Sequence, residues 1–474
     1  MTALRVVNAL LVTPSGVREG GVWSEDGVIR LVGDNGRLPG ADTTIDAAGR
    51  FLLPGLIDPH VHLGTGGSAD DAKFLQDLCT ETQAAAAGGI TTIVTDHENA
   101  HGQSWITTLI ERDGETLLQH AKRAIAGRSP VDVRYTANPS SARHLDEMPR
   151  LVEASVTSYK MFPSYVGEEA EEFGIATVGM DYIYEALEVI ASLDRPWRPT
   201  TGMVHCEEPS ICALLKARLR KTDSSLRAWT RARPAICEAM QIADVGLIAK
   251  ETGARMYIPH VSSDEGVRMI EYLQARGARI AGETCPHYLV SEFPWQAGTF
   301  GKVNPPVRNG PDRDQLWRAL SDNRLEALGS DNCRYRLSEK TGKDVWDAIP
   351  GFSEIYLSLP LMLTEGISAG RIDWPTLARI ASENPARRFA MYPKKGALQP
   401  GSDADLTIVA ADERWTVRAK DFAHPAEYSL YEGMEMTGRS VMSIRRGEVI
   451  AEPGWIAAGG GAYVDTPPPA AAAR

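Results

Sequence analysis

The chain has 474 residues, of which 43% are hydrophobic and 24% charged, and 50 Lys and Arg against 62 Asp and Glu give a net charge of −12. A pI near 5.4 argues against nucleic-acid binding, and no apolar run approaches the ~20 residues that a membrane-spanning helix needs. Because the N-terminus resembles no signal sequence and the six cysteines form no CxxC pair, we expect a cytoplasmic protein without nucleic-acid or membrane partners.

Both ends of the chain have the pattern of short β-strands separated by turns. Near the N-terminus, apolar and β-branched runs occupy residues 4–12, 22–23 and 28–32. The same pattern returns around Gly and Asp turns in residues 404–409, 415–417 and 440–449. We expect the two ends to form one small β-structure that the chain leaves and later rejoins.

The middle of the chain alternates strands with helices. Short, β-rich apolar runs occur eight times, at residues 52–57, 91–95, 131–136, 157–162, 201–205, 255–260, 279–284 and 326–329. Apolar residues at helical spacing predict helices at residues 70–87, 115–126, 180–192, 235–252 and 264–276. Strands that alternate with helices imply a parallel sheet, and eight such units imply an α/β fold of the (β/α)8 TIM-barrel type.

Residues that bind metals or transfer protons fall where the predicted barrel strands end. The first strand ends in Asp58-Pro-His60-Val-His62, where strand alternation puts both imidazoles on one face. Lys160, His205, His260 and Asp331 end the fourth, fifth, sixth and eighth strands. Because the catalytic groups of a barrel lie at the C-terminal ends of its strands, we expect these six side chains to converge.

Taken alone, each feature has an ordinary structural explanation. Two histidines two residues apart often lie on a surface strand, a single lysine is usually solvated, and Gly-Ser-Asp is usually a turn or a helix cap. Their joint placement favours a metal site, because imidazole nitrogen and carboxylate oxygen suit zinc, manganese, cobalt and iron. We therefore predict two divalent ions as cofactors, with Zn2+ as the first choice and Mn2+, Co2+ or Fe2+ as alternatives.

Lys160 needs a chemical change before it can bind metal, because its ammonium group repels cations. Reaction with CO2 makes a carbamate whose two oxygens can bridge two ions. On this hypothesis, one ion is held by His60, His62 and Asp331, and the other by His205 and His260. A bridging hydroxide would attack an amide-like bond, with Asp331 carrying the proton to the leaving nitrogen.

With these residues the chain resembles the amidohydrolase superfamily, and within it the cyclic amidohydrolases: hydantoinase or dihydropyrimidinase, with allantoinase and dihydroorotase as relatives. The likeness runs over most of the chain, through Gly88-Gly-Ile-Thr-Thr, Arg233-Pro, Pro259-His-Val-Ser-Ser, Glu283-Thr-Cys-Pro-His-Tyr-Leu and Ser382-Glu-Asn-Pro-Ala-Arg. The resemblance implies that the chain ends form a β-sandwich beside the barrel. We assign the barrel to residues 54–391, the sandwich to residues 1–53 plus 392–456, and a flexible, low-complexity tail to residues 457–474.

The resemblance also implies substrate contacts. Tyr165 stands five residues after Lys160, where hydantoinases have a Tyr that hydrogen-bonds the substrate carbonyl oxygen; the alternative is an aromatic residue that lines a loop. Asn304, Gly351 and Phe352 occupy further substrate-binding positions. They depart from the hydantoinase pattern, which has Ser in place of Asn304 and Asn-Gly in place of Gly351-Phe352. The catalytic residues therefore look intact while recognition of the ring looks altered.

Other residues are expected outside the ligand set. Asp331 is followed by Asn332, where the family commonly has His. His97, His101 and His287 are expected in loops or behind the ligands. Glu207 and Glu208 are candidate partners for a neighbouring histidine, with solvated carboxylates as the alternative.

The resulting prediction is a binuclear metal-dependent hydrolase that opens a cyclic amide of the hydantoin or dihydropyrimidine type, with Asp331 and Tyr165 as catalytic residues. Two alternatives remain. The same chemistry could act on a noncyclic amide, a carbamate, a urea derivative, allantoin or dihydroorotate, or the chain could be a non-catalytic scaffold, against which retention of all six ligand positions argues. The partner is a small amide-type molecule, and a homo-oligomer, specifically a tetramer, is implied by the resemblance alone.

Overall fold

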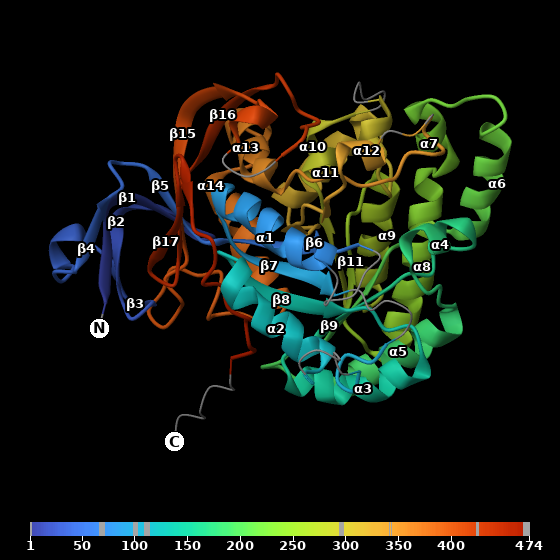
Figure 1. Ribbon diagram of the computed structural model, residues 1–474, viewed down its shortest axis with the longest axis horizontal. Helices are drawn as coiled ribbons and strands as arrows, with labels where there is room; N and C mark the ends of the chain where they lie inside the picture. The colour runs from blue at the N-terminus through green and yellow to red at the C-terminus, as the bar shows by residue number, and fades with distance from the viewer. Residues whose placement is uncertain are drawn as a thin grey trace.

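The computed structural model describes residues 2–65, 72–97, 103–108, 114–292, 298–340, 342, 344–422 and 426–467. A parallel barrel and a β-sandwich domain made from both chain ends lie side by side (Figure 1). This arrangement confirms the fold class predicted from the sequence. Within the described ranges, no helix combines the length and the apolar character needed to cross a membrane.

The barrel is closed by a strand in two pieces. Its strands are β6 (Leu56–His62), β7 (Ile90–His97), β8 (Asp132–Ala137), β9 (Ser158–Met161), β10 (Thr201–Val204), β11 (Met256–Ile258), β12 (Ile280–Thr284), β13 (Ala327–Leu328) and β14 (Asn332–Cys333). They pair in parallel in the order β13-β12-β11-β10-β9-β8-β7-β6-β14. Since β13 pairs with β12 and β14 pairs with β6, residues 327–333 close the sheet.

The first predicted barrel strand, residues 52–57, is divided between two sheets. β5 (Phe51–Pro54) pairs with sandwich strands, and β6 begins the barrel at Leu56. Gly55 lies at the junction, where a Cβ atom would stand 2.2 Å from Thr91 Oγ1 and 2.8 Å from Asp405 Cβ. Only glycine permits this close approach, so the apolar run continues through a change of sheet.

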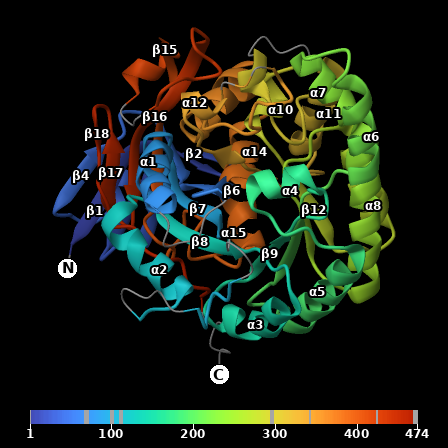
Figure 2. The ribbon, with the colours of Figure 1, turned by 45° about the vertical axis from the view of Figure 1, so that its right-hand side comes forward.

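Helices cover the outside of the barrel (Figure 2). The five predicted helices appear as α1 (Ala72–Ala87), α2 (Leu117–Arg128), α5 (Met180–Leu193), α8 (Ala235–Thr252) and α9 (Asp264–Ala275). The sequence analysis missed α3 (Ala142–Glu153), α4 (Glu168–Phe173), α6 (Pro209–Leu219), α7 (Leu226–Ala232), α10 (Pro286–Val290), α11 (Gly310–Ser321), α12 (Leu337–Lys340), α13 (Ser358–Leu361), α14 (Trp374–Ala378) and α15 (Asn384–Arg388). Several of these are too short for a periodic pattern, and α3 contains Pro149.

The sandwich domain joins the two chain ends in one mixed sheet. Its strands are β1 (Ala3–Thr13), β2 (Gly16–Glu25), β3 (Val28–Gly33), β4 (Thr43–Asp46), β5, β15 (Leu406–Thr416), β16 (Glu435–Arg445), β17 (Glu448–Glu452) and β18 (Trp455–Ile456). The two halves meet where β5 pairs with β15. Val6, Leu11, Leu52, Ile408 and Ile444 are fully buried in the core of this domain.

The described part of the predicted flexible tail packs against the barrel. Gly461 N donates to Ser129 O at 2.7 Å, and Val464 N donates to Val133 O at 2.9 Å. The buried Arg134 side chain donates to Val464 O at 2.8 Å. These contacts hold part of residues 457–467, where the sequence predicts a flexible tail, against the start of β8. Residues 468–474 lie outside the described residues.

A buried lysine joins the barrel to the sandwich. Lys395 Nζ lies 2.6 Å from Asp132, 2.9 Å from Asp403 and 2.6 Å from Asp405. The three carboxylates are near enough to one another to hold a metal ion, but the ammonium group already contacts all three. Burial opposes the charged carboxylate, yet Lys395 and Arg446 lower the pKa of Asp132 to about 2.

Replacing this lysine tests its contribution to stability. Lys395→Met leaves buried carboxylates without their cation, and we expect the free energy of unfolding to fall by about 3–5 kcal/mol. Urea denaturation at pH 7 measures it, with the half-buried neighbour Lys394→Met as the control. Because folding lowers the pKa of Asp132 from 3.8 to about 2, its contribution is present above pH 3.8 and is lost as the pH falls toward 2. Equal stability of the two variants would contradict this role.

Candidate active site

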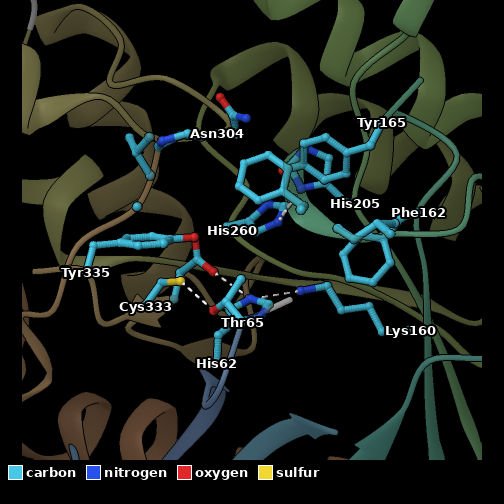
Figure 3. A pocket seen from close by; sticks show the side chains of 16 residues that line it. His62, Thr65, Lys160, Phe162, Tyr165, His205, His260, Asn304, Cys333 and Tyr335 are labelled. Carbon is cyan, nitrogen blue, oxygen red and sulfur yellow. Dashed lines mark hydrogen bonds and ion pairs between the residues drawn. The ribbon is translucent and has the colours of Figure 1, made fainter. Parts of the chain in front are cut away.

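Six side chains selected from the sequence meet at the C-terminal end of the barrel. This six-residue cluster consists of His60, His62, Lys160, His205, His260 and Asp331, four of which are labelled in Figure 3. The Nε2 atoms of His60 and His62 lie 3.4 and 3.3 Å from Asp331 Oδ1. One ligand atom from each of these three residues lies within 4.8 Å of the others, close enough for one metal ion.

Lys160 and a second pair of histidines complete the cluster. Lys160 Nζ, on β9, lies 2.5 Å from His60 Nε2 and 3.4 Å from His62 Nε2. His205 follows β10 and His260 follows β11, and His205 Nδ1 is 2.9 Å from His260 Nε2. The His260 ring centroid is 5.3 Å from that of His60. The structure therefore brings together all six residues at which the sequence predicts metal ligands.

Two members of the cluster have a strained backbone. The φ angle is +42° at His260 and +53° at Asp331, in the left-handed region that residues with a Cβ atom rarely adopt. Asp331 is held there by its backbone N–H, which donates to His60 O at 3.0 Å. Such strain collects at functional sites, where the surrounding structure stabilises it.

Carboxylates orient three of the histidine rings from behind. His60 Nδ1 lies 2.7 Å from Glu283 Oε1, and His205 Nε2 lies 3.0 Å from Glu207 Oε2. His62 Nδ1 lies 3.6 Å from Asp96 Oδ2, a contact at ion-pair distance. A ring nitrogen that donates to such a carboxylate leaves the opposite nitrogen with a lone pair directed into the cluster, which is the arrangement of metal-binding histidines.

Burial sets the charge of the cluster. It holds the pKa of His60 and His260 well below the usual range, with the neighbouring Lys160 acting in the same direction. These imidazoles are therefore neutral at pH 7 and available as ligands. Burial would raise the pKa of Asp331, but the adjacent histidines hold it well below its usual range, so this group is a carboxylate.

The donor set fits divalent metal ions. Neutral imidazole nitrogens and a carboxylate converge without competing thiols among the ligand atoms. Buried acids also exceed buried cations around Lys160: burial raises the pKa of Asp58 to about 6 and that of Glu283 well above its usual range. Bound cations would stabilise the ionised form of these groups, so the residues present are suited to a metal centre.

A cavity opens over the cluster (Figure 3). One wall is apolar and aromatic and consists of Phe162, Tyr165, Phe173 and Ile175. The lining also includes Thr65, Val303, Asn304, Cys333, Tyr335, Pro350 and Gly351. A small molecule in this cavity would contact the cluster at its base and the apolar wall with any substituent it carries.

Comparison with known proteins gives the family. A model of the amidohydrolase family matches residues 51–449. The chain belongs to this family.

Relatives of this amidohydrolase are similar over nearly their whole length. An L-hydantoinase of Paenarthrobacter aurescens is 30% identical over 95% of this chain and 94% of its own. An allantoinase of Rubrobacter xylanophilus is 31% identical over 96% and 95%. The solved structure of an L-hydantoinase (dihydropyrimidinase) from Arthrobacter aurescens has a TM-score of 0.86 at 29% identity, covering 98% of this chain and 100% of that one. These similarities agree with the resemblance inferred from the sequence motifs.

The predicted substrate contacts of the amidohydrolase have mixed outcomes. Tyr165 lines the cavity with its ring centroid 4.8 Å from that of His205, and burial raises the pKa of its hydroxyl, which therefore stays protonated. Asn304 also lines the cavity, and its buried Nδ2 has no hydrogen-bond partner among the described residues. An unpartnered buried donor of this kind is suited to a ligand atom.

Gly351 and Phe352 are separated by the structure. Gly351 lines the cavity, but Phe352 does not belong to its lining within the described part of the chain. The Phe352 carbonyl accepts a bond from Cys333 N at 3.0 Å, and its ring packs 5.1 Å from that of His287 in the core. The substrate contact predicted at Phe352 stays a prediction, and the ring of this residue lies beside His287.

Sequence reasoning missed several residues around the cluster. Asp96 lies 3.1 Å from Lys160 Nζ, and it follows the predicted strand at 91–95, so the strand-end argument could have found it. Glu283 and Arg233 lie in two of the motifs that carry the family resemblance, but the sequence assigns neither residue a role. Their roles depend on contacts across the barrel, which strand periodicity does not encode.

The remaining histidines lie away from the ligand positions or outside the description. His287 is fully buried, its ring centroid is 4.1 Å from that of Tyr288, and burial lowers its pKa to about 4. The His97 side chain and all of His101 lie outside the described residues. Of the two predicted carboxylates, Glu207 contacts His205, whereas the Glu208 side chain accepts hydrogen bonds from the first turn of α6.

Glu283 tests the orienting carboxylates. Glu283→Gln replaces the acceptor at His60 Nδ1, so we expect the affinity for divalent metal to fall about 10–100-fold. Chelator competition followed by metal analysis measures this change. The control is Tyr257→Phe, which removes only the 2.8 Å bond from the Tyr257 hydroxyl to Glu283 Oε2. Metal affinity equal to that of the native protein in Glu283→Gln would contradict the orienting role.

Proposed function

We propose that this amidohydrolase opens a cyclic amide of the hydantoin or dihydropyrimidine type with the help of two divalent metal ions. One observation carries the proposal: six ligand-type side chains converge at the C-terminal end of the barrel, and five of them line a small-molecule cavity, in a chain of this family. L-hydantoinase and dihydropyrimidinase are the printed names of similar proteins.

The six-residue cluster would hold the ions, with zinc as the first choice. His60, His62 and Asp331 would bind one ion, His205 and His260 the other, and Lys160 both, as a CO2-derived carbamate. When bound, the ions supply Lewis acidity toward a water molecule and toward the amide carbonyl. The neutral imidazoles and their carboxylate partners support this assignment.

Two residues of the chain would act on the reacting atoms. The Asp331 carboxylate accepts a proton from the attacking water and delivers it to the leaving ring nitrogen. The protonated Tyr165 hydroxyl donates a hydrogen bond to the carbonyl oxygen as negative charge develops there. Asn304 Nδ2 and the Gly351 backbone would contact the ring, and Phe162, Phe173 and Ile175 favour an apolar or aromatic ring substituent.

A second candidate is another cyclic ureide, allantoin, because an allantoinase is 31% identical over nearly the whole chain. Turnover of hydantoin, dihydrouracil, allantoin, dihydroorotate and an aryl carbamate, measured side by side, separates the candidates. The proposal expects hydantoins or dihydrouracil to give the highest kcat/KM. Absence of turnover with every cyclic substrate would contradict it. Assembly as a homotetramer and a cytoplasmic location are further proposals that rest on the resemblance and on the sequence.

Lys160 tests the shared ligand. Lys160→Ala removes the only side chain proposed to contact both ions. Substitution of a residue that orients a metal ligand lowers metal affinity or activity roughly 10–100-fold, and we expect Lys160→Ala to lower turnover and bound metal by more than that. Metal analysis of purified protein and kcat/KM are the measurements. Lys122→Met, which removes a lysine bonded to Ala154 O away from the cavity, is the control. Full turnover and full metal content in Lys160→Ala would refute the bridging role.

Substitution of Tyr165 tests the proposed hydrogen bond to the substrate carbonyl oxygen. Tyr165→Phe keeps the ring but removes the hydroxyl, so we expect kcat to fall about 10²–10³-fold with unchanged metal content. Tyr182→Phe, which loses a hydroxyl bonded to Ser141 O, is the matched control. A native kcat for Tyr165→Phe would support the alternative of an aromatic residue that only lines the cavity.

A further inference from the structure

A chain of buried charges leads from the cluster to the wall of the cavity. Arg233 follows α7, and its side chain is 3% exposed. Its Nη1 atom lies 2.5 Å from Glu207 Oε2, and its Nη2 atom lies 2.5 Å from Glu169 Oε2. One planar guanidinium group therefore connects two carboxylates from different segments, the fixed geometry at which arginine is superior to lysine.

The inner end of this chain holds a residue of the cluster. Glu207 Oε2 lies 3.0 Å from His205 Nε2, and the Glu207 backbone N–H donates to Ser164 Oγ and Gln241 Oε1 at 3.0 Å each. Arg233 Nη1 contacts the same Oε2 atom of Glu207. Arg233 thus holds in place the carboxylate group that sets the orientation of His205.

The outer end holds the cavity wall. Glu169 lies in α4, and Lys216 Nζ on α6 contacts its other oxygen, Oε1, at 2.9 Å. Helix α4 ends at Phe173, which lines the cavity. The Phe173 ring centroid is 5.2 Å from that of Tyr165. The position of Phe173 in the cavity is therefore tied to the ion pairs of Glu169.

Helix α4 lies between two glycines and packs in a small apolar cluster. Gly167 and Gly174 flank the helix with φ angles of +58° and +63°, so the backbone turns sharply at both ends. A second cavity is lined by Val166, Glu169, Lys216, Trp229 and Arg233 among others. Two kinds of contact hold this six-residue helix: Ala170 and Phe173 are buried in an apolar cluster with Phe162 and Tyr165, and Glu169 forms the ion pairs with Arg233 and Lys216.

We propose that Glu169 and Arg233 are positioning residues: they hold α4 as the specificity-determining wall for an apolar or aromatic substituent of the substrate, and Arg233 links this wall to His205 through Glu207. The inference rests on the proposed function for the nature of the substrate. The link is a physical one, because both carboxylates share a single guanidinium group. A displacement of α4 changes the environment of the same arginine that holds Glu207.

Glu169→Gln tests the wall without breaking the Arg233–Glu207 pair. Loss of a charge-assisted hydrogen bond is expected to change two quantities, a cleavage rate and a substrate selectivity, by at least about tenfold. Chymotrypsin cleavage after Phe173, followed by mass spectrometry, should become faster by that factor. The ratio of kcat/KM for a benzyl-substituted over an unsubstituted hydantoin should fall to the same extent, while metal content stays at the level of the native protein. Glu171→Gln, an exposed acid on the same helix, is the matched control.

Arg233 variants test the link to the cluster. Arg233→Gln should speed cleavage after Phe173 and also lower metal affinity, whereas Arg233→Lys should restore part of both. If Arg233→Gln does not fold, Lys216→Met tests the outer end by the same cleavage assay, with a smaller acceleration expected.

The outcomes separate this inference from the proposed function. Native rates of cleavage and native selectivity in Glu169→Gln would overturn the positioning role. Native metal affinity in folded Arg233→Gln would overturn the link to His205. If the native protein turned over none of the cyclic substrates, the proposed function would fail on its own, and the cleavage and metal measurements would still decide the role of Glu169 and Arg233.

Discussion

Closure of the barrel by residues 327–333 is the constraint on which the site depends. The two short pieces of this segment, β13 and β14, pair with β12 and β6, and between them the backbone leaves strand geometry at Asp331. The Asp331 N–H bonds to the His60 carbonyl, so the contact that closes the sheet also sets the carboxylate against two imidazoles. A regular strand here would close the barrel but direct alternate residues toward the core.

Buried charge is the second organising feature. Each of His60, His62 and His205 has its own carboxyl group behind it, and the Lys160 side chain lies beside the His60 and His62 rings. Removing one partner of such a pair leaves a buried polar group without its hydrogen bond, which is costly. This cost makes the arrangement rigid, and rigidity is what a site for two cations and a small substrate requires.

Stability and chemistry are placed at different ends of the barrel. Lys395 and its three aspartates join the barrel to the sandwich. Residues 457–467 bond to the backbone at the start of β8, also away from the cavity. The cavity is built from the segments that follow the strands, including the short α4 wall. Substituent recognition can therefore vary in these segments while the cluster and the domain junction stay unchanged.

The sequence by itself determined the fold class and all six residues of the cluster. Strand alternation and the alternation of strands with helices are local patterns, and a parallel barrel brings every strand end to one rim. Tertiary structure alone decided which carboxylate supports which histidine: His60 and Glu283 are 223 residues apart, and Arg233 joins Glu169 to Glu207 across three segments. It also turned Phe352 into the core and paired a glycine-rich tail with β8. These outcomes depend on packing between distant segments, on which side-chain periodicity carries no information.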